Sequence, residues 1–218
     1  MNWKLILTGL AIAGGVNWYL YERPVSHPAG ILVPELPRVS STDRRPWTEA
    51  DGLRYRPLKR LHIRARLLSR SNVKLGGWAD ISPVDLGLGW GRMSDSGIIE
   101  QLDMGEYNAV ISGTRFLSIS IRRDAPIQHW PRAERDAIFS QLTHLHAIPA
   151  DDSIEKALKG LRPGQVLSLD GQLVQISDPR GNVRLTSSTI LGDRNCEVMW
   201  VESLALSDPG AASPDEGR

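Results

Sequence analysis

The side chains in this sequence best suited to chemistry are two histidines, several carboxylates and one cysteine. His144 and His146 are separated by one residue, so in a strand both would project from the same face, a spacing that metal sites use. Because Cys196 is distant in sequence, the expected third ligand is a carboxylate, with Asp80, Asp85 and Asp151 as candidates, or His62 if the strands align. The simpler arrangement has one histidine bonded to backbone and the other exposed, so we predict no metal and no cofactor.

Acid–base catalysis is a second use of these side chains. A carboxylate beside a histidine can move protons, so the candidate catalytic residues are Asp85, Asp95 and His146, with or without a metal. An enzyme should gather all three in one pocket and perturb the pKa of at least one of them. Cys196 could be a nucleophile with His144 or His146 as base, although a single cysteine is more often a buried structural thiol.

The segment from Leu58 to Arg70 has the alternation of a half-buried strand. Every second residue from Leu61 to Leu67 is apolar, and the residues between them include Arg64 and Arg66. One face should join the core and the other should be basic. The basic face is expected either to bind an acidic partner, lipid headgroups or nucleic acid, or to be balanced by acidic neighbours.

The run GGWADISPVDLGLGWGRMSD, residues 76–95, is dense in glycine, tryptophan and aspartate. Ser82 and Pro83 are typical of the start of a short helix, and the glycines after it predict tight turns rather than a phosphate-binding loop. We expect a loop that packs two tryptophans into or over the mouth of a barrel. With the basic strand, this loop supplies the candidate binding residues, which are Arg64, Arg66, Trp78, Trp90 and Arg92.

The rest of the pattern indicates short strands with a few short helices. Strands are expected at 109–112, 114–122, 166–176, 183–187 and 197–206, and helices within 94–102, 131–142 and 153–160. Short strands that bend at a glycine such as Gly171 are found in small barrels. We therefore predict a mainly β (α+β) fold, a small OB-like or other closed β-barrel with two or three short helices, preceded by one transmembrane helix.

The N-terminal residues predict a membrane anchor. Residues 5–21 carry no charge and are about as short as a membrane-spanning helix can be, with aromatic residues at both ends. No small-x-small site follows, which favours a retained signal-anchor over a cleaved signal peptide. Lys4 favours a cytoplasmic N-terminus, so the globular domain of this single-pass protein is expected on the periplasmic, extracytoplasmic side of a bacterial inner membrane.

Four regions follow from these patterns. They are the transmembrane anchor at 1–23, a Pro-rich linker at 24–52, the β-rich globular domain at 53–206 and a disordered tail at 207–218. The prolines make the linker extended, and residues 31–33 are its one apolar island, able to dock on the domain.

Composition excludes one class of protein and makes another less favoured. The 26 Lys and Arg residues and the 25 Asp and Glu residues give a net charge of +1, so there is no overall field to attract nucleic acid. The single cysteine cannot form an internal disulfide, which excludes a disulfide-stapled scaffold.

Several motifs resemble those of a family of uncharacterised bacterial proteins with an N-terminal membrane segment and a small β-rich domain. They are GGWADISPVDLGLGWGRMSD, HAIPAD, RPGQVLSLDGQLV and CEVMWV, within residues 54–204. The recurring pattern includes the run from Asp80 to Asp95 and His146 but not His144, which argues against a paired-histidine metal site. The resemblance implies the architecture and brings no activity, cofactor or catalytic residue.

The function predicted from the sequence is a membrane-tethered, non-enzymatic binding module. Its partner would be a protein or another polymer, with nucleic acid less favoured, bound through the basic strand and the tryptophan-rich loop. The first alternative is a hydrolase that uses Asp85, Asp95 and His146. The second is a membrane-complex assembly factor whose apolar segment pairs with other membrane helices.

Overall fold

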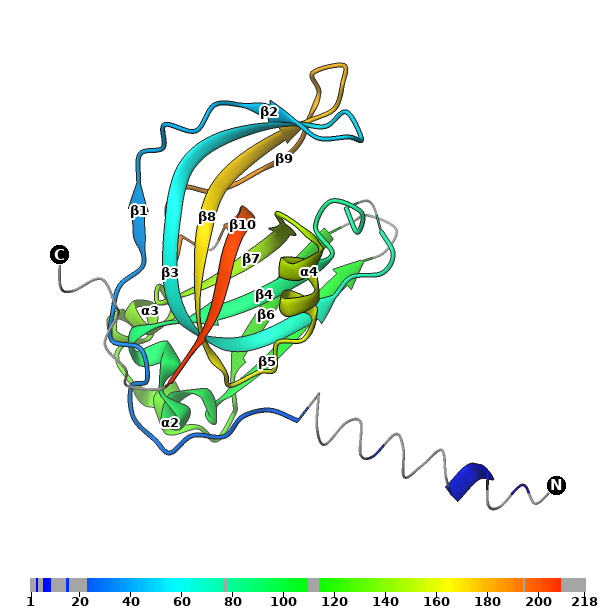
Figure 1. Cartoon of the computed structure of the whole chain (residues 1–218). Coiled ribbons are helices and arrows are strands. Elements are labelled where there is room, and N and C mark those ends of the chain that lie inside the picture. The colour runs from blue at the N-terminus through cyan, green and yellow to red at the C-terminus, as the bar shows by residue number, and fades with distance from the viewer. Residues whose placement is uncertain are drawn as a thin grey trace.

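The structure is a computed structural model that describes residues 3, 6–8, 15, 23–76, 78–109, 114–193 and 195–208 (Figure 1). Most of the predicted anchor at 5–21 lies outside the described residues, as does the predicted tail beyond residue 208. Within the described residues, no helix has both the length and the apolar character needed to cross a membrane.

Strands dominate the part of the chain that the structure describes. They are β1 (Arg38–Ser40), β2 (Trp47–Thr48), β3 (Arg54–Asn72), β4 (Val84–Gly89), β5 (Leu102–Ala109), β6 (Thr114–Ile121), β7 (Leu142–Pro149), β8 (Val166–Ser177), β9 (Val183–Thr186) and β10 (Cys196–Ser207). The helices are short: α2 (Ser96–Ile99), α3 (Arg132–Phe139) and α4 (Asp152–Lys159), with 3₁₀ turns at Gly91–Ser94 and Pro126–His129. The mainly β prediction with a few short helices is confirmed.

One mixed sheet holds most of the strands, in the order β1-β3-β4-β7-β10-β8-β9. Because β3 also pairs with β8, the strands β3, β4, β7, β10 and β8 form a continuous ring of hydrogen-bonded neighbours. Figure 1 shows β3 and β8 curving side by side along their length. All these pairs are antiparallel except β7 and β10, which run parallel.

The main core lies inside this ring. Leu61, Ile63, Ala65 and Leu67 of β3 are completely buried there, as their alternation predicts. Alternate residues of the other ring strands, such as Leu145, complete the same core. Each buried leucine or isoleucine stabilises the fold by about 1.5–3 kcal/mol relative to an exposed side chain. The opposite faces of the ring strands point away from this core.

A second layer covers part of the ring's outer face. Strands β5 and β6 form a separate antiparallel pair. A Cβ at Gly87 of β4 would lie 2.8 Å from the Leu117 side chain of β6, so the β5–β6 pair approaches β4 closely. Apolar residues of this pair, α2 and α3, such as Ile98, Ile119 and Ile138, pack in a core of their own.

Two local expectations meet different outcomes. The helix expected to begin at Ser82 is wrong, because Val84 begins β4, whose pairing with both β3 and β7 outweighs a local capping signal. Docking of the linker's apolar island is confirmed, since Leu32 and Val33 are buried in the ring core while Ile31 is exposed.

Gly171 sits where β8 passes close to β10. A Cβ at this position would lie 2.0 Å from the Trp200 carbonyl oxygen, a backbone atom that cannot move without separating paired strands. We expect Gly171→Ala to lower the free energy of unfolding by about 1–3 kcal/mol. The matched control is Gly105→Ala, where a Cβ would have nothing within 4 Å. Urea denaturation measures both, and equal losses of stability would contradict this packing argument.

Candidate functional site

Three neighbouring strands place a cysteine, two histidines and an aspartate on one face. The parallel register sets Cys196 of β10 opposite His144 of β7. The antiparallel register of β4 sets Asp85 opposite His146. Alternate residues of a strand share a face, so these four side chains lie together on the outer face of the ring, beneath the β5–β6 pair.

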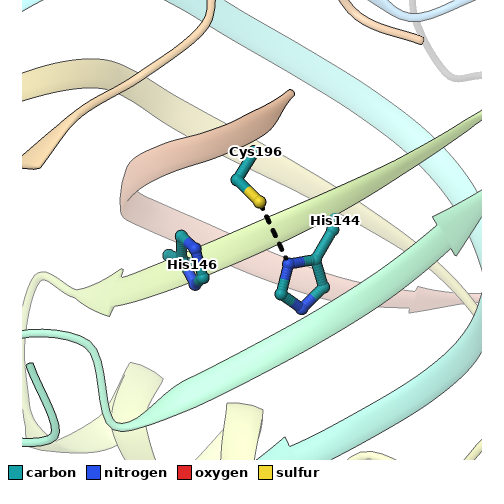
Figure 2. A group of neighbouring side chains, drawn as sticks. All are labelled: His144, His146 and Cys196. Atoms are coloured by element: carbon teal, nitrogen blue, oxygen red, sulfur yellow. Dashed lines mark hydrogen bonds between the residues drawn. The ribbon is translucent and has the colours of Figure 1, made fainter. Parts of the chain in front are cut away.

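The cysteine sulfur contacts the histidine pair directly. Cys196 Sγ lies 3.4 Å from His144 Nδ1 (Figure 2). One nitrogen from each histidine and the sulfur all lie within 4.8 Å of one another, and the two imidazole rings are nearly perpendicular. The expectation that Cys196 is too distant in sequence to join the histidines is therefore wrong, because parallel pairing of β7 and β10 unites them.

One ring nitrogen of each histidine is hydrogen bonded to a carboxylate. His146 Nδ1 lies 2.8 Å from Asp85 Oδ1, and His144 Nε2 lies 3.1 Å from Glu106 Oε2. Glu106 comes from β5, and its other oxygen accepts a hydrogen bond from the Ser69 hydroxyl of β3. For His144 the sulfur and the carboxylate therefore lie at opposite nitrogens of the ring.

A buried arginine from β6 completes the cluster. Arg115 Nε lies 3.1 Å from Asp85 Oδ2, and Arg115 also donates a hydrogen bond to the Ser82 carbonyl oxygen at 2.9 Å. Its remaining terminal nitrogen lies 3.4 Å from His146 Nδ1. Arg115 therefore neutralises Asp85 and fixes the carboxylate that holds His146.

The surroundings of the thiol favour its ionised form. Burial opposes a charge on Cys196, but hydrogen bonds and positive charge from His144 and His146 outweigh burial and lower the pKa of the thiol to about 6. Burial likewise opposes a charge on His144, but its hydrogen bonds to Cys196 and Glu106 raise its pKa to about 9. Despite burial, the hydrogen bond to Asp85 raises the pKa of His146. At neutral pH the cluster therefore contains a thiolate next to the His144 imidazolium, and a thiolate is the form in which cysteine is nucleophilic.

Glu197 belongs to the opposite face of β10. It alternates with Cys196 along the strand, is completely buried and accepts a hydrogen bond from the Thr143 hydroxyl. Burial raises the pKa of Glu197 to about 9, so at neutral pH it is an uncharged acid at the ring core. Its second oxygen has no hydrogen-bond partner among the described residues.

A pocket of about 630 Å³ opens beside the thiol, between β6, α3, β7 and β10. Cys196 and His144 line it, whereas His146 does not. Its apolar walls are Phe116, Leu117, Ile119, Ile121, Phe139 and Leu142, and its polar lining is Arg132, Arg135, Asp136, Thr143 and Asn195. This volume lies within the range of small-molecule sites, about 300–1,000 Å³. Cys196 therefore stands at the wall of a pocket that can hold a ligand of that size.

The three catalytic candidates named from the sequence are only partly brought together. Asp85 and His146 are hydrogen bonded within the cluster. Asp95 instead caps α2, where it accepts hydrogen bonds from the backbone N–H groups of Gly97 and Gly30 at 2.8 Å. Asp95 therefore has a structural role, and the expectation that it shares a pocket with the other two is wrong.

The exposed basic face expected on β3 is wrong for its two central arginines. Arg64 and Arg66 are only 4% and 7% exposed. Arg64 pairs with Glu35 at 3.0 Å, and Arg66 donates to the Ser94 carbonyl and the Ser96 hydroxyl. The linker and the residues around the start of α2 cover these two side chains, so neither guanidinium group is available to a partner.

The aromatic part of the predicted binding surface is also partly internal. Trp90 is buried in the ring core. Trp78 is half-buried against a smaller apolar cluster, with the Arg184 guanidinium 5.0 Å from its ring. Arg92 lies over the ring of Trp130. The tryptophans thus pack into the domain, as expected, but in different places.

The chain matches no protein-family model, no curated protein and no solved structure.

Proposed function

We propose that this protein is a cysteine-dependent hydrolase whose nucleophile is Cys196. The observation that carries the proposal is the contact of Cys196 Sγ with His144 Nδ1 at 3.4 Å, with Glu106 on the opposite ring nitrogen. A nucleophile, a base and a group that orients the base are the parts of a catalytic triad. The same sulfur and the same histidine line an open pocket.

The arrangement supports acyl transfer in two steps. The Cys196 thiolate attacks the carbonyl carbon of the substrate, and the His144 imidazolium protonates the leaving group as the thioester forms. The neutral imidazole then takes a proton from water, whose oxygen attacks the thioester. The carboxylic acid leaves and the thiolate and imidazolium are restored.

The two histidines have different roles in this proposal. His144 reaches both the thiol and the pocket, so it is the catalytic acid and base. His146 lies outside the pocket lining and is held by Asp85, which Arg115 fixes in turn. His146, Asp85 and Arg115 are therefore positioning residues that stabilise the thiolate.

The pocket favours a substrate with an apolar acyl group. Six aliphatic or aromatic side chains form its walls, and burying an apolar acyl chain against them is favourable by about 0.8 kcal/mol per methylene. Arg132 and Arg135 stand among the polar residues of the pocket, with Asp136 close to Arg132. An uncharged ester or thioester with a short aliphatic acyl group is the substrate class that fits these walls.

The test uses the full-length protein with p-nitrophenyl acetate and p-nitrophenyl hexanoate. We expect a burst of nitrophenolate close to one equivalent and a mass increase of one acyl group, localised to Cys196 by peptide mass spectrometry. For each ester, the rate with the protein is divided by the rate with free cysteine. This ratio should be larger for the hexanoate than for the acetate. His144→Ala should abolish the burst, whereas His129→Ala, which removes an exposed histidine outside the pocket lining, should retain it. Acylation at another residue would contradict the proposal.

Several sequence predictions accompany this proposal. The OB-like or other closed barrel is supported by the ring of paired strands. Anchoring by residues 5–21 in the inner membrane, with the domain on the extracytoplasmic side, is supported by the uncharged N-terminal run and its aromatic ends. The binding module and the assembly factor stay predictions. We prefer the hydrolase because Arg64 and Arg66, two of the proposed binding residues, are buried.

A further inference from the structure

We propose that His144, His146 and Cys196 form a Zn²⁺ site, and that a bound ion shields the sulfur from electrophiles. The ion-binding part stands on geometry alone. The further statement that zinc inhibits the enzyme rests on the hydrolase function proposed above. The three side chains come from two strands paired in parallel, so their spacing is fixed by a hydrogen-bonded ladder rather than by a loop.

The distances suit a tetrahedral zinc ion. Zinc binds thiolate at about 2.3 Å and imidazole at about 2.0–2.1 Å, so two ligands of one ion are separated by roughly 3.3–3.6 Å. Cys196 Sγ and His144 Nδ1 lie 3.4 Å apart. One nitrogen of each histidine and the sulfur all lie within 4.8 Å of one another, so small side-chain movements would bring the third ligand into the same range. Figure 2 shows the sulfur of Cys196 directed toward His144, with His146 beside them.

The second layer around these residues has the form found in metal sites. A histidine that binds a metal usually donates its other ring N–H to a carboxylate, which fixes the ring and its tautomer. Asp85 is hydrogen bonded to Nδ1 of His146, and Glu106 is hydrogen bonded to Nε2 of His144. The other nitrogen of each ring, which for His144 is the Nδ1 that contacts the sulfur, is therefore the one that an ion would bind.

The charges of the cluster balance with a divalent cation. Asp85, Glu106 and the Cys196 thiolate are negative, and Arg115 is the positive group paired within the cluster. With two neutral imidazoles bound to the ion, two positive charges bring the cluster to neutrality. A buried site that is neutral overall avoids the cost of an uncompensated charge.

The donor set selects the metal, and the pocket leaves room for a water. One thiolate and two imidazoles suit zinc and disfavour magnesium or calcium, which prefer oxygen ligands. Cys196 and His144 line the pocket, so an ion can enter and keep a water as its fourth ligand. A thiolate bound to zinc shares one of its lone pairs with the metal, so it is a much weaker nucleophile toward a substrate carbonyl than the free thiolate.

The binding test is calorimetric titration of the full-length protein, freed of metals with a chelator, first with ZnCl₂ and then with MgCl₂. We expect one equivalent of Zn²⁺ to bind and Mg²⁺ not to bind. His144→Ala and Cys196→Ala should each weaken zinc binding by at least about 100-fold. The control His62→Ala, which removes a half-buried histidine bonded to Asp170 rather than to this cluster, should bind normally. Unchanged affinity in both site variants would overturn the site.

Shielding is measured without any substrate turnover. The rate at which iodoacetamide alkylates Cys196 should fall by at least about 100-fold once one equivalent of Zn²⁺ is bound, and the chelator should restore it. Cobalt substitution should add a thiolate charge-transfer band that Cys196→Ala lacks. Alkylation that continues at the metal-free rate would overturn the shielding. Failure of the hydrolase proposal would appear separately, as absent ester turnover in the metal-free protein.

Discussion

Replacing Cys196 by alanine is expected to lower the rate of p-nitrophenyl ester hydrolysis by at least about 10³-fold, because the acyl group then has no nucleophile to receive it. The pocket, His144 and Glu106 stay in place, so binding of the ester should change little. Steady-state kinetics of the full-length protein would show this as a fall in kcat with a small change in KM.

The fold should survive this substitution, which makes the kinetic result interpretable. Cys196 is at the start of β10 and is only partly buried, and alanine keeps its backbone hydrogen bonds. Cys196→Ser is the matched variant, because a hydroxyl keeps the shape but is a far weaker nucleophile than a thiolate at neutral pH. A variant without the thiol that hydrolyses the ester at the original rate would exclude Cys196 as the nucleophile.

The strands of the ring could be predicted because their core faces carry a regular signal. The alternation from Leu61 to Leu67 correctly identified which side chains of β3 enter the core. The same period of two placed His144 and His146 on one face of a strand. These are local properties, since they depend only on neighbours in sequence and on the pleat of a strand.

The composition of the site could not be predicted because it depends on register between distant strands. Cys196 meets His144 only because β10 pairs in parallel with β7, and a shift of one residue would turn the thiol to the ring core. Glu106 and Arg115 arrive on the β5–β6 pair, which docks from outside the ring. No local pattern in the sequence specifies that docking.

Alternation also could not distinguish solvent from a second layer of protein. Arg64 and Arg66 face away from the ring core as predicted, yet the linker and the residues before α2 cover them. The sequence of β7 gives a clearer indication that a second layer of protein covers the sheet. Its outward residues include two histidines and no Lys, Arg, Asp or Glu, and an outward face without these residue types indicates that another layer covers it.

The docked β5–β6 pair therefore links stability to the site. Arg115 of β6 is a buried cation whose ion-pair partner is Asp85, and Glu106 of β5 is a buried anion bonded to His144. Each of these two charges is compensated by a group on the ring. If the β5–β6 pair separated from the ring, these charges would lose their partners. Both histidines would also lose contacts that hold them in place.

Asp85→Ala is accordingly expected to lower the free energy of unfolding by about 3–5 kcal/mol, the cost of leaving one member of a buried pair uncompensated. Asp85 is 1% exposed and contacts both Arg115 and His146. Removing its carboxylate leaves a guanidinium group buried without its counter-ion. Urea denaturation followed by tryptophan fluorescence measures the loss.

The matched control for this loss is Asp103→Ala, which removes an aspartate of β5 that pairs with Arg122 at 3.0 Å. Both of these side chains are more than half exposed, so the loss should be below about 1 kcal/mol. Adding Arg115→Leu to Asp85→Ala should recover part of the stability, because the unpaired charge is removed. If Asp85→Ala cost no more than Asp103→Ala, the Asp85 to Arg115 pair could not be what holds the β5–β6 layer on the ring.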